Sequence, residues 1–176
     1  GVLMNQGIHI IDLLVWFLGD PVEVHSFAST GRRTVEVENS AAAVLRFDSG
    51  ALASLTGTIT AAPGFPHRLE IYGTNGGIQI EGESVLRWTL NDPSLATVEP
   101  WPLATEQVDA GMAGDPRGIA ASGHIAILGD FIDAIRSGKD PAIDGREGRR
   151  SLAAVLAVYD NAGLKRGKEG EIVNGE

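Results

Sequence analysis

Cysteine is absent from this chain, which excludes a disulfide framework and any metal site built on thiolates. Long apolar runs are absent too. The longest run, from Ile8 to Leu18, is interrupted by His9 and Asp12 and falls far short of the roughly 20 residues that a membrane-spanning helix needs. We therefore expect no membrane partner, and a cytoplasmic location is the default expectation.

Positive charge is also scarce, because 14 lysines and arginines stand against 23 aspartates and glutamates. The resulting net charge of -9 repels phosphate groups, so we expect neither nucleic acids nor anionic membranes as partners. Hydrophobic residues still make up 43% of the 176 residues, which is enough for a core. We expect residues 1–176 to form a single domain.

The order of the predicted elements indicates an α+β fold. Helices are predicted at residues 8–18 and 124–137 and from residue 144 to about residue 163. This order is typical of an open, mostly antiparallel sheet with helices packed on one face. Residues 91–123 show no sustained period and are predicted to form a long loop. Strands are predicted at residues 22–29, 34–38 (weakly), 41–47, 51–60, 67–72, 77–82 and 84–90.

Hydrophobic periodicity also predicts which side of each helix is buried. In the last helix, Asp144 is the expected N-cap and Glu147 its capping-box partner. In the first helix, a continuous apolar face is expected from Leu13, Leu14, Phe17 and Leu18. The expected buried residues are Ile127, Leu128, Phe131, Ile132 and Ile135 in the second helix, and Leu152, Val155, Leu156 and Tyr159 in the third.

One predicted strand, at residues 51–60, has two contrasting faces. Small hydroxyl side chains alternate with apolar ones, so that one face of the sheet is apolar and the other is lined with hydroxyl groups. The hydroxyl side chains are Ser54, Thr56, Thr58 and Thr60.

The strongest chemical signal is a polar cluster at the start of the first predicted helix. Asn5 lies four residues before His9, and Asp12 lies three residues after it. His9, Asp12 and Trp16 share one face of the helix, and Asn5 precedes it. An imidazole beside short polar groups can exchange protons near neutral pH. The structural alternatives are a helix cap for Asn5, a buried and hydrogen-bonded His9, and an Asp12 that binds a loop amide.

Other polar motifs give weaker signals. His124 opens a helix after the long loop and could line a pocket, although a lone histidine is more often structural. His25 and His67 have no spacing to acidic residues that would make a metal site, so we expect no metal. The segment from Gly73 to Gly77 lacks the spacing of a phosphate-binding loop and is followed by a strand, which predicts a hairpin turn.

The opening segment GVLMNQGIHIIDLL, followed by WFLG at residues 16–19, resembles the signature that opens the C-terminal domain of the glucose–fructose oxidoreductase/inositol dehydrogenase (Gfo/Idh/MocA) family. Residues 67–76 are similar to the family's second hairpin, residues 130–138 to its penultimate helix, and residues 141–148 to the start of its last helix. The resemblance covers nearly the whole chain in the right order, and the opening signature is its most specific part.

This resemblance implies an NAD(P)-dependent oxidoreductase that acts on a sugar, a sugar derivative or a cyclitol. In that family an N-terminal Rossmann domain binds the nicotinamide cofactor and supplies a lysine from a Glu-Lys-Pro motif. The C-terminal domain supplies the substrate pocket and an open sheet whose outer face makes homodimers or tetramers. By motif position His9 is the catalytic histidine and Asn5 stands where many members have an aspartate, while Asp12 and His124 lie near the substrate.

Two departures from the family pattern affect this expectation. Asn5 cannot take up a proton, so His9 should be less basic than in an aspartate-bearing relative, or the lysine does more of the acid–base work. In addition, neither GxGxxG nor Glu-Lys-Pro occurs in the 176 residues. We therefore expect a fragment that starts inside its parent's active-site motif, lacks the dinucleotide-binding domain, binds no NAD and is inactive alone.

Two other functions remain open at this point. The chain could be a non-catalytic relative, a module that binds or scaffolds partners through its sheet. A standalone hydrolase using His9 and Asp12 is a weaker possibility, because no nucleophile or metal accompanies them. The hydroxyl face of the sheet predicts a homo-oligomer, with a solvent-facing sheet as the alternative.

Overall fold

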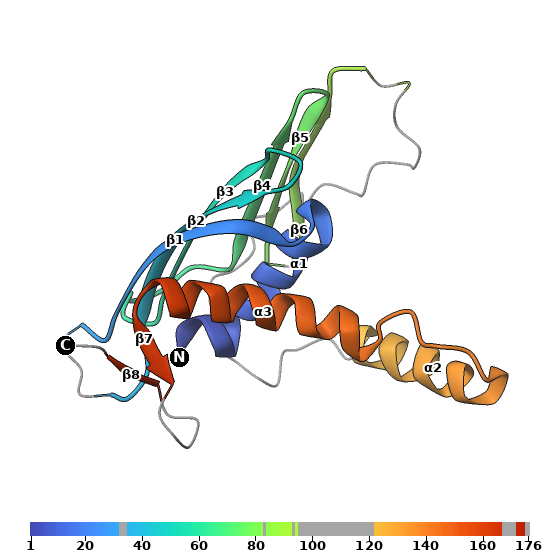
Figure 1. The fold of residues 1–176 in the computed structure, drawn as a ribbon. Helices are drawn as coiled ribbons and strands as arrows, with labels where there is room; N and C mark the ends of the chain where they lie inside the picture. Colours follow the sequence, from blue (N-terminus) through green and yellow to red (C-terminus); the bar gives the residue numbers. More distant parts are fainter. Residues whose placement is uncertain (32–34, 83, 93, 95–121, 167–171, 175–176) are drawn as a thin grey trace. The chain divides into compact units, whose positions relative to one another are not determined.

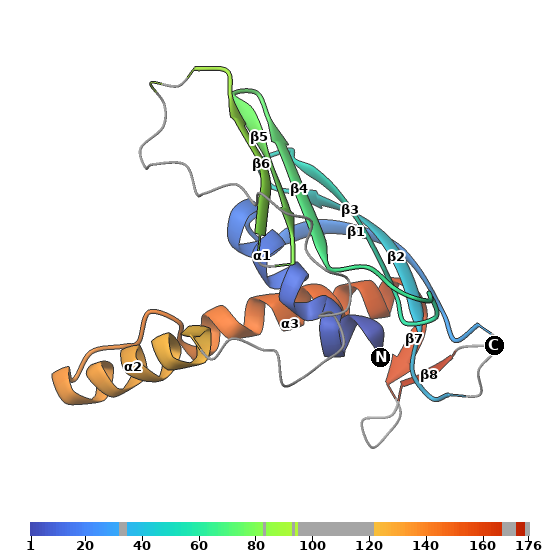
Figure 2. The same cartoon turned by 180° about the vertical axis from the view of Figure 1, so that it is seen from behind.

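A computed structural model describes residues 1–31, 35–82, 84–92, 94, 122–166 and 172–174 (Figures 1 and 2). The chain divides into two compact units, residues 1–61 with 121–176 and residues 62–120. Among the described residues, no helix is both long enough and apolar enough to cross a membrane. The elements are η1 (Leu3–Gly7), α1 (Ile8–Leu18), β1 (Pro21–Ser29), β2 (Ser40–Phe47), β3 (Leu52–Thr58), β4 (Arg68–Gly73), β5 (Gly76–Glu81), β6 (Ser84–Leu90), α2 (Ser122–Ser137), α3 (Gly145–Asn161), β7 (Leu164–Arg166) and β8 (Ile172–Asn174).

The first unit is built on an antiparallel sheet with the strand order β1-β2-β3. Ala43 lies opposite Ser26 on one side and Leu55 on the other, and burial alternates along β2. The inward side chains of β2 pack with η1, α1 and α3 into one hydrophobic core. Figures 1 and 2 show α1 and α3 side by side next to this sheet. The predicted arrangement of helices on one face of an antiparallel sheet is therefore confirmed.

The second unit is another antiparallel sheet, with the order β4-β5-β6. Thr74 and Asn75 form the turn between β4 and β5, as the glycine-rich sequence predicts. Gly76 has a φ of 153°, and a Cβ at this position would lie 2.0 Å from the carbonyl oxygen of Thr89. This close approach to β6 explains why a glycine is needed there. The segment is a hairpin turn and not a phosphate loop.

The start of the first helix differs from the prediction. The helical run begins at Val2 and passes through a π-helical turn, η1, before it becomes α1. Asn5 therefore lies inside the helical run and not before it. The buried residues of α1 are Ile11, Leu14 and Val15, whereas Phe17 is 43% exposed. Phe17, on the predicted apolar face, lies at the surface, where its ring packs edge-on against its neighbour Trp16 with 4.7 Å between ring centroids.

The prediction for α3 is largely confirmed. Oδ1 of Asp144 accepts hydrogen bonds from the backbone amides of Arg146 (2.8 Å) and Glu147 (2.9 Å). The Glu147 side chain accepts a hydrogen bond from Arg150 at 2.6 Å and not from the backbone amide of Asp144. Asp144 therefore caps the helix without the second bond of a capping box. Val155 and Tyr159 are fully buried, but the prediction for Leu152 was wrong, since this side chain is 38% exposed.

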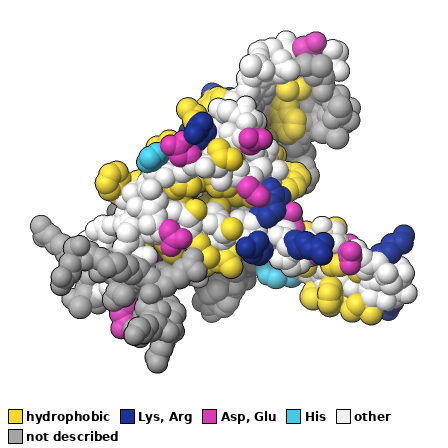
Figure 3. All heavy atoms as spheres, in the orientation of Figure 1, with side chains coloured by type: hydrophobic (Ala, Val, Ile, Leu, Met, Phe, Trp, Pro, Cys, Tyr) yellow, Lys and Arg dark blue, Asp and Glu magenta, His cyan; other side chains and the backbone are white. Residues whose placement is uncertain are grey.

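The prediction of a buried face on α2 was wrong. Its large apolar side chains are exposed, and Figure 3 shows apolar side chains gathered on one side of this helix. Periodicity determines which side of a helix is apolar, but it does not determine what covers that side, and the described elements place little apolar surface against it. The exposed residues are Ile127, Leu128, Phe131, Ile132 and Ile135.

Three smaller differences concern strands and loops. Residues 35–38, predicted as part of a weak strand, form bends that lead Glu38 and Asn39 into the core. The short strands β7 and β8 pair with each other and were not predicted. Most of the long loop predicted at residues 91–123 lies outside the described residues.

Candidate active site on the first helical run

The polar cluster at the N-terminal end of the chain is open to solvent. Asn5, His9 and Asp12 are all exposed. Among the described residues, none of these three side chains makes a hydrogen bond or an ion pair with another protein group. At the N-cap positions of η1 and α1, Val2 and Gly7, the residue's own side chain makes no capping hydrogen bond. Within the described part of the chain, Asn5 does not cap the helix, His9 is exposed, and Asp12 makes no hydrogen bond to a loop amide.

Helix geometry gives these residues a common side. His9 and Asp12 are separated by three residues within α1, so their side chains project from neighbouring positions on the helix surface. Trp16 follows one turn later and is 66% exposed. Asn5 lies in the preceding turn, across the junction between η1 and α1. The result is a surface with an amide, an imidazole, a carboxylate and an indole, which suits a ligand with several hydroxyl groups.

The opposite side of the same helical run is fixed in the core. Val2 and Leu3 are 6% and 1% exposed, and Ile11 and Val15 continue this buried side. Gly57 of β3 lies directly beneath Leu3, because a Cβ on this glycine would be 3.4 Å from a Leu3 methyl group. The exposed polar residues are therefore carried by a helix whose back is packed against the sheet.

Arg150 of α3 holds the other end of α1, a role that sequence reasoning missed. Its guanidinium donates to Oδ1 of Asp20 at 2.7 Å and to the carbonyl oxygen of Val15 at 3.2 Å. The hydrogen bond to Asp20 raises the pKa of Arg150 above its already high usual value. No sequence signal pointed to this contact, because its partners lie about 130 residues away along the chain.

A buried carboxylate, Glu38, was also missed. Its side chain is fully buried and accepts hydrogen bonds from the backbone amide of Leu3 and the hydroxyl of Tyr159. A glutamate in the run VEVEN is typical of an exposed strand or turn, so the sequence gave no sign that this one enters the core.

The structure does not join His124 to this cluster by any contact among the described residues. His124 lies near the start of α2 and is exposed. No hydrogen bond or ion pair within the described part of the chain links it to His9, Asn5 or Asp12. Its expected place near the substrate stays a prediction.

The acidic and histidine side chains and the glycine-rich turn bear on whether this chain can hold a metal or a dinucleotide. In the described ranges, no group of three or more histidine, aspartate or glutamate side chains could hold a metal ion. The turn from Gly73 to Gly77 joins two antiparallel strands, so it offers no helix N-terminus to a pyrophosphate. This turn is therefore not a phosphate-binding loop.

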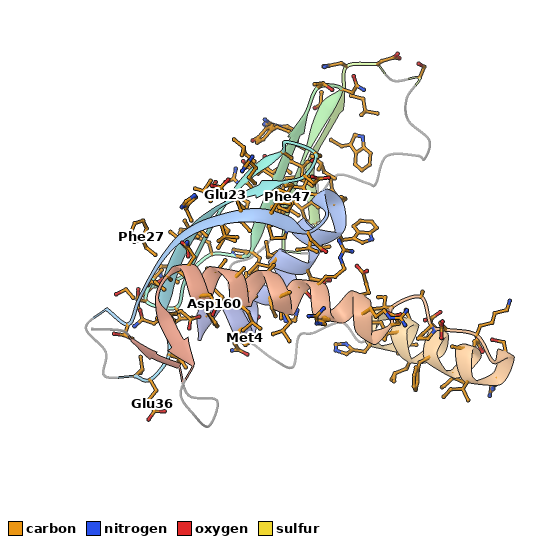
Figure 4. All side chains as sticks on the ribbon, in the orientation of Figure 1. Met4, Glu23, Phe27, Glu36, Phe47 and Asp160 are labelled. Carbon is orange, nitrogen blue, oxygen red and sulfur yellow. The ribbon has the colours of Figure 1, made fainter. Side chains whose placement is uncertain are left out.

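A second surface feature is the outer face of the β1–β3 sheet. Ser54 and Thr56 are exposed as predicted, and Oγ1 of Thr58 is 2.8 Å from the hydroxyl of Ser40. Phe27 is 84% exposed, and Figure 4 shows it pointing away from the helices. A shallow depression of about 420 Å³ lies beside it, lined mainly by Phe27, Ser29, Ser40, Ala42, Thr56 and Thr58.

Comparison with known proteins gives a consistent match. Residues 1–79 match the sequence profile described as the GFO/IDH/MocA C-terminal domain. Myo-inositol 2-dehydrogenase of Thermotoga maritima is 27% identical over 184 residues, which include 99% of this chain and 51% of that protein. D-apiose dehydrogenase of Paraburkholderia graminis is 25% identical over 166 residues, which include 92% of this chain and 42% of that protein.

Solved structures agree with the sequence matches. The WlbA dehydrogenase from Bordetella pertussis, solved in complex with NADH and UDP-GlcNAcA, matches with a TM-score of 0.71 and 28% identity. The match covers 92% of this chain and 43% of that one. The predicted resemblance is therefore confirmed, and the chain spans about half the length of the curated relatives it matches.

Proposed function

Because this chain has the opening signature and the fold of the GFO/IDH/MocA C-terminal domain, we propose that it is the substrate-binding and oligomerisation part of an NAD(P)-dependent oxidoreductase. The substrate is a hydroxyl group of a sugar, a sugar derivative or a cyclitol. The curated relatives are named as dehydrogenases of myo-inositol and D-apiose, which supports this substrate class. The observation that carries the proposal is the exposed cluster of Asn5, His9 and Asp12 on an anchored helical run.

In this proposal His9 is the acid–base residue. Oxidation of an alcohol to a ketone releases the hydroxyl proton, and an imidazole is suited to accept it near neutral pH. The Asn5 amide donates a hydrogen bond to the substrate, and the Asp12 carboxylate accepts one from a neighbouring hydroxyl. The reaction also needs a nicotinamide to accept the hydride, and no step through that cofactor is assigned to the residues of this chain. The isolated chain is proposed to bind no NAD(P) and to be inactive. A titration that showed micromolar binding of NAD(H) to the chain would refute the first part.

We propose that the outer face of β1–β3 binds a second copy of the chain. Phe27, Val44 and Leu52 are 84%, 51% and 70% exposed on this sheet. They alternate with small hydroxyl side chains, which remain compatible with water before association. A sheet face of mixed small polar and apolar side chains can meet its symmetry-related copy in an isologous interface. A homodimer, or a tetramer that also uses this face, is the expected assembly.

The substrate proposal is tested on the chain itself by NMR of its histidine rings. We expect myo-inositol, D-apiose or a related polyol to shift the His9 ring resonances saturably, and His9→Ala or Asp12→Ala to abolish or weaken binding. His25→Ala is the matched control, because His25 is exposed but lies on β1 and pairs with Glu23. If no polyol, sugar or nucleotide sugar perturbs His9, the non-catalytic binding module becomes the better account.

A further inference from the structure

Glu38 stands apart from the other acidic residues because its side chain has no exposed surface. A carboxylate is very rarely found in this state unless hydrogen bonds compensate for the loss of water. Oε1 accepts from the backbone amide of Leu3 at 2.9 Å and from the hydroxyl of Tyr159 at 2.8 Å. Oε2 has no hydrogen-bond partner in the described structure.

The partners of Glu38 are the free donors at the start of the helical run. The first amides of a helix have no partner within the helix, and here Val2 brings no side-chain cap. Glu38 supplies both missing acceptors, because its carbonyl oxygen accepts from Val2 at 3.1 Å while its side chain accepts from Leu3. Its negative charge also lies at the positive end of the helix dipole. Glu38 is thus a helix cap contributed by a segment 35 residues away.

This cap lies close to the candidate active site. The π-helical turn that follows Val2 contains Asn5, and His9 is the second residue of α1. With about 1.5 Å of rise per residue, Leu3 and His9 are roughly 9 Å apart along the helix. π-Helical turns are rare and occur mostly as single turns within helices, frequently at functional sites. The angular relation between Asn5 and His9 depends on this turn.

Tyr159 links the cap to α3. Its side chain is fully buried, and burial raises its pKa strongly, with the hydrogen bond to Glu38 as the next cause. The hydroxyl therefore stays protonated and remains a donor to the carboxylate. One buried network thus joins the start of the helical run, the loop before β2, and α3.

We propose that Glu38 is a positioning residue, whose buried carboxylate holds the π-helical turn so that Asn5 and His9 face the same substrate. The catalytic part of this inference rests on the proposed role of His9. The structural part, that Glu38 holds residues 3–9 selectively, does not rest on it. The two parts are therefore tested separately.

The first experiment is amide hydrogen exchange on the 176-residue chain, comparing wild type with Glu38→Gln. We expect exchange at residues 3–8 to become about 10- to 100-fold faster, while Ala43 and Leu45 in β2 change little. Glu36→Gln is the matched control, because Glu36 lies two residues earlier in the same loop and is exposed. Equal acceleration throughout the chain, or none at residues 3–8, would overturn the proposal.

A second variant keeps the test decisive if Glu38→Gln does not fold. Tyr159→Phe removes one of the two donors to Oε1 and leaves the carboxylate in place. We expect the amides of residues 3–8 to exchange faster by a smaller factor than in Glu38→Gln. We also expect the chemical shift of the His9 ring to change in this variant. Unchanged exchange at residues 3–8 in this variant contradicts the proposed link.

The second experiment measures steady-state kinetics in the natural gene product that contains these residues. Glu38→Gln is expected to lower kcat about tenfold or more and to leave KM within a few-fold, because the substrate still binds to a misaligned His9. If His9→Ala is also without effect, the proposed function fails while the exchange result stands. If His9→Ala abolishes activity and Glu38→Gln does not change kcat, the positioning inference alone fails.

Discussion

Nε of Arg150 donates a 2.7 Å hydrogen bond to Oδ1 of Asp20, and the same guanidinium reaches the carbonyl oxygen of Val15. These contacts fasten α3 to the C-terminal end of α1, the helix that carries His9 at its other end. Arginine can do this because its planar group presents several donors in fixed directions.

Replacing Arg150 with lysine should therefore destabilise the chain although the charge is kept. A lysine ammonium cannot contact Asp20, Glu147 and the Val15 carbonyl at the same time, so we expect Arg150→Lys to lower the free energy of unfolding by about 0.5–1 kcal/mol. Urea unfolding followed by circular dichroism measures this. Arg149→Lys is the matched control at the neighbouring exposed position and should leave stability unchanged.

The hydroxyl of Tyr159 should matter far more than that of the other tyrosine. Tyr159→Phe leaves the buried Glu38 carboxylate without one of its two donors, so we expect the free energy of unfolding to fall by about 1–3 kcal/mol. Tyr72→Phe also removes a hydrogen bond to a glutamate, Glu70, but Tyr72 is 80% exposed. Water replaces that bond, and equal losses in the two variants would contradict the importance assigned to burial.

The cap of α3 predicts a specific pH dependence. Hydrogen bonds from the amides of Glu147 and then Arg146 lower the pKa of Asp144 in the folded chain. A carboxyl with a lowered folded pKa stabilises the fold above its unfolded pKa, and this contribution is lost as pH falls through the folded pKa. We expect wild type to have a higher Tm than Asp144→Asn at neutral pH, and this difference to vanish in acid.

Thermal unfolding between neutral and acidic pH measures this difference. Asp140→Asn, in the loop before the cap, serves as the control and should follow the wild-type curve over the whole range. A Tm difference between wild type and Asp144→Asn that grows towards acid pH would show that the sign assigned here is wrong.

The proposed oligomer predicts that one exposed phenylalanine is more important than another. Phe27 and Phe65 are 84% and 83% exposed, but only Phe27 lies on the outer face of β1–β3. Phe27→Asp places a charge in the proposed interface, so we expect it to shift the chain from dimer to monomer, while Phe65→Asp does not. Sedimentation equilibrium over a range of concentrations measures this, and a monomeric wild type would contradict the proposal.

The hairpins show what the sequence could predict. Alternating small and apolar residues define the inward side of β2 and β3, and Gly50, with a φ of 84°, allows the tight turn between them. These are local signals, and each needs only a few neighbouring residues. The same holds for Asp144 as the cap of α3 and for His9 and Asp12 on one helix side.

The missed features depend on contacts between distant parts of the chain. Glu38 is buried because Tyr159 and Leu3 meet it there, and Tyr159 lies 121 residues away. The π-helical turn around Asn5 spans only five residues, which is too short for sequence periodicity to separate it from an α-helix. For α2, periodicity identified the apolar side of the helix but carried no information about whether another element packs against it.

The most direct test of the central claim is the effect of His9→Ala on nicotinamide-dependent oxidation by the natural gene product that contains these residues. With a polyol or sugar identified by the NMR titration, we expect kcat to fall about 100- to 10,000-fold with little change in KM, as for loss of a general base. His25→Ala should retain wild-type activity. If His9→Ala stays within a few-fold of wild type, His9 is not the acid–base residue and the account is wrong at its centre.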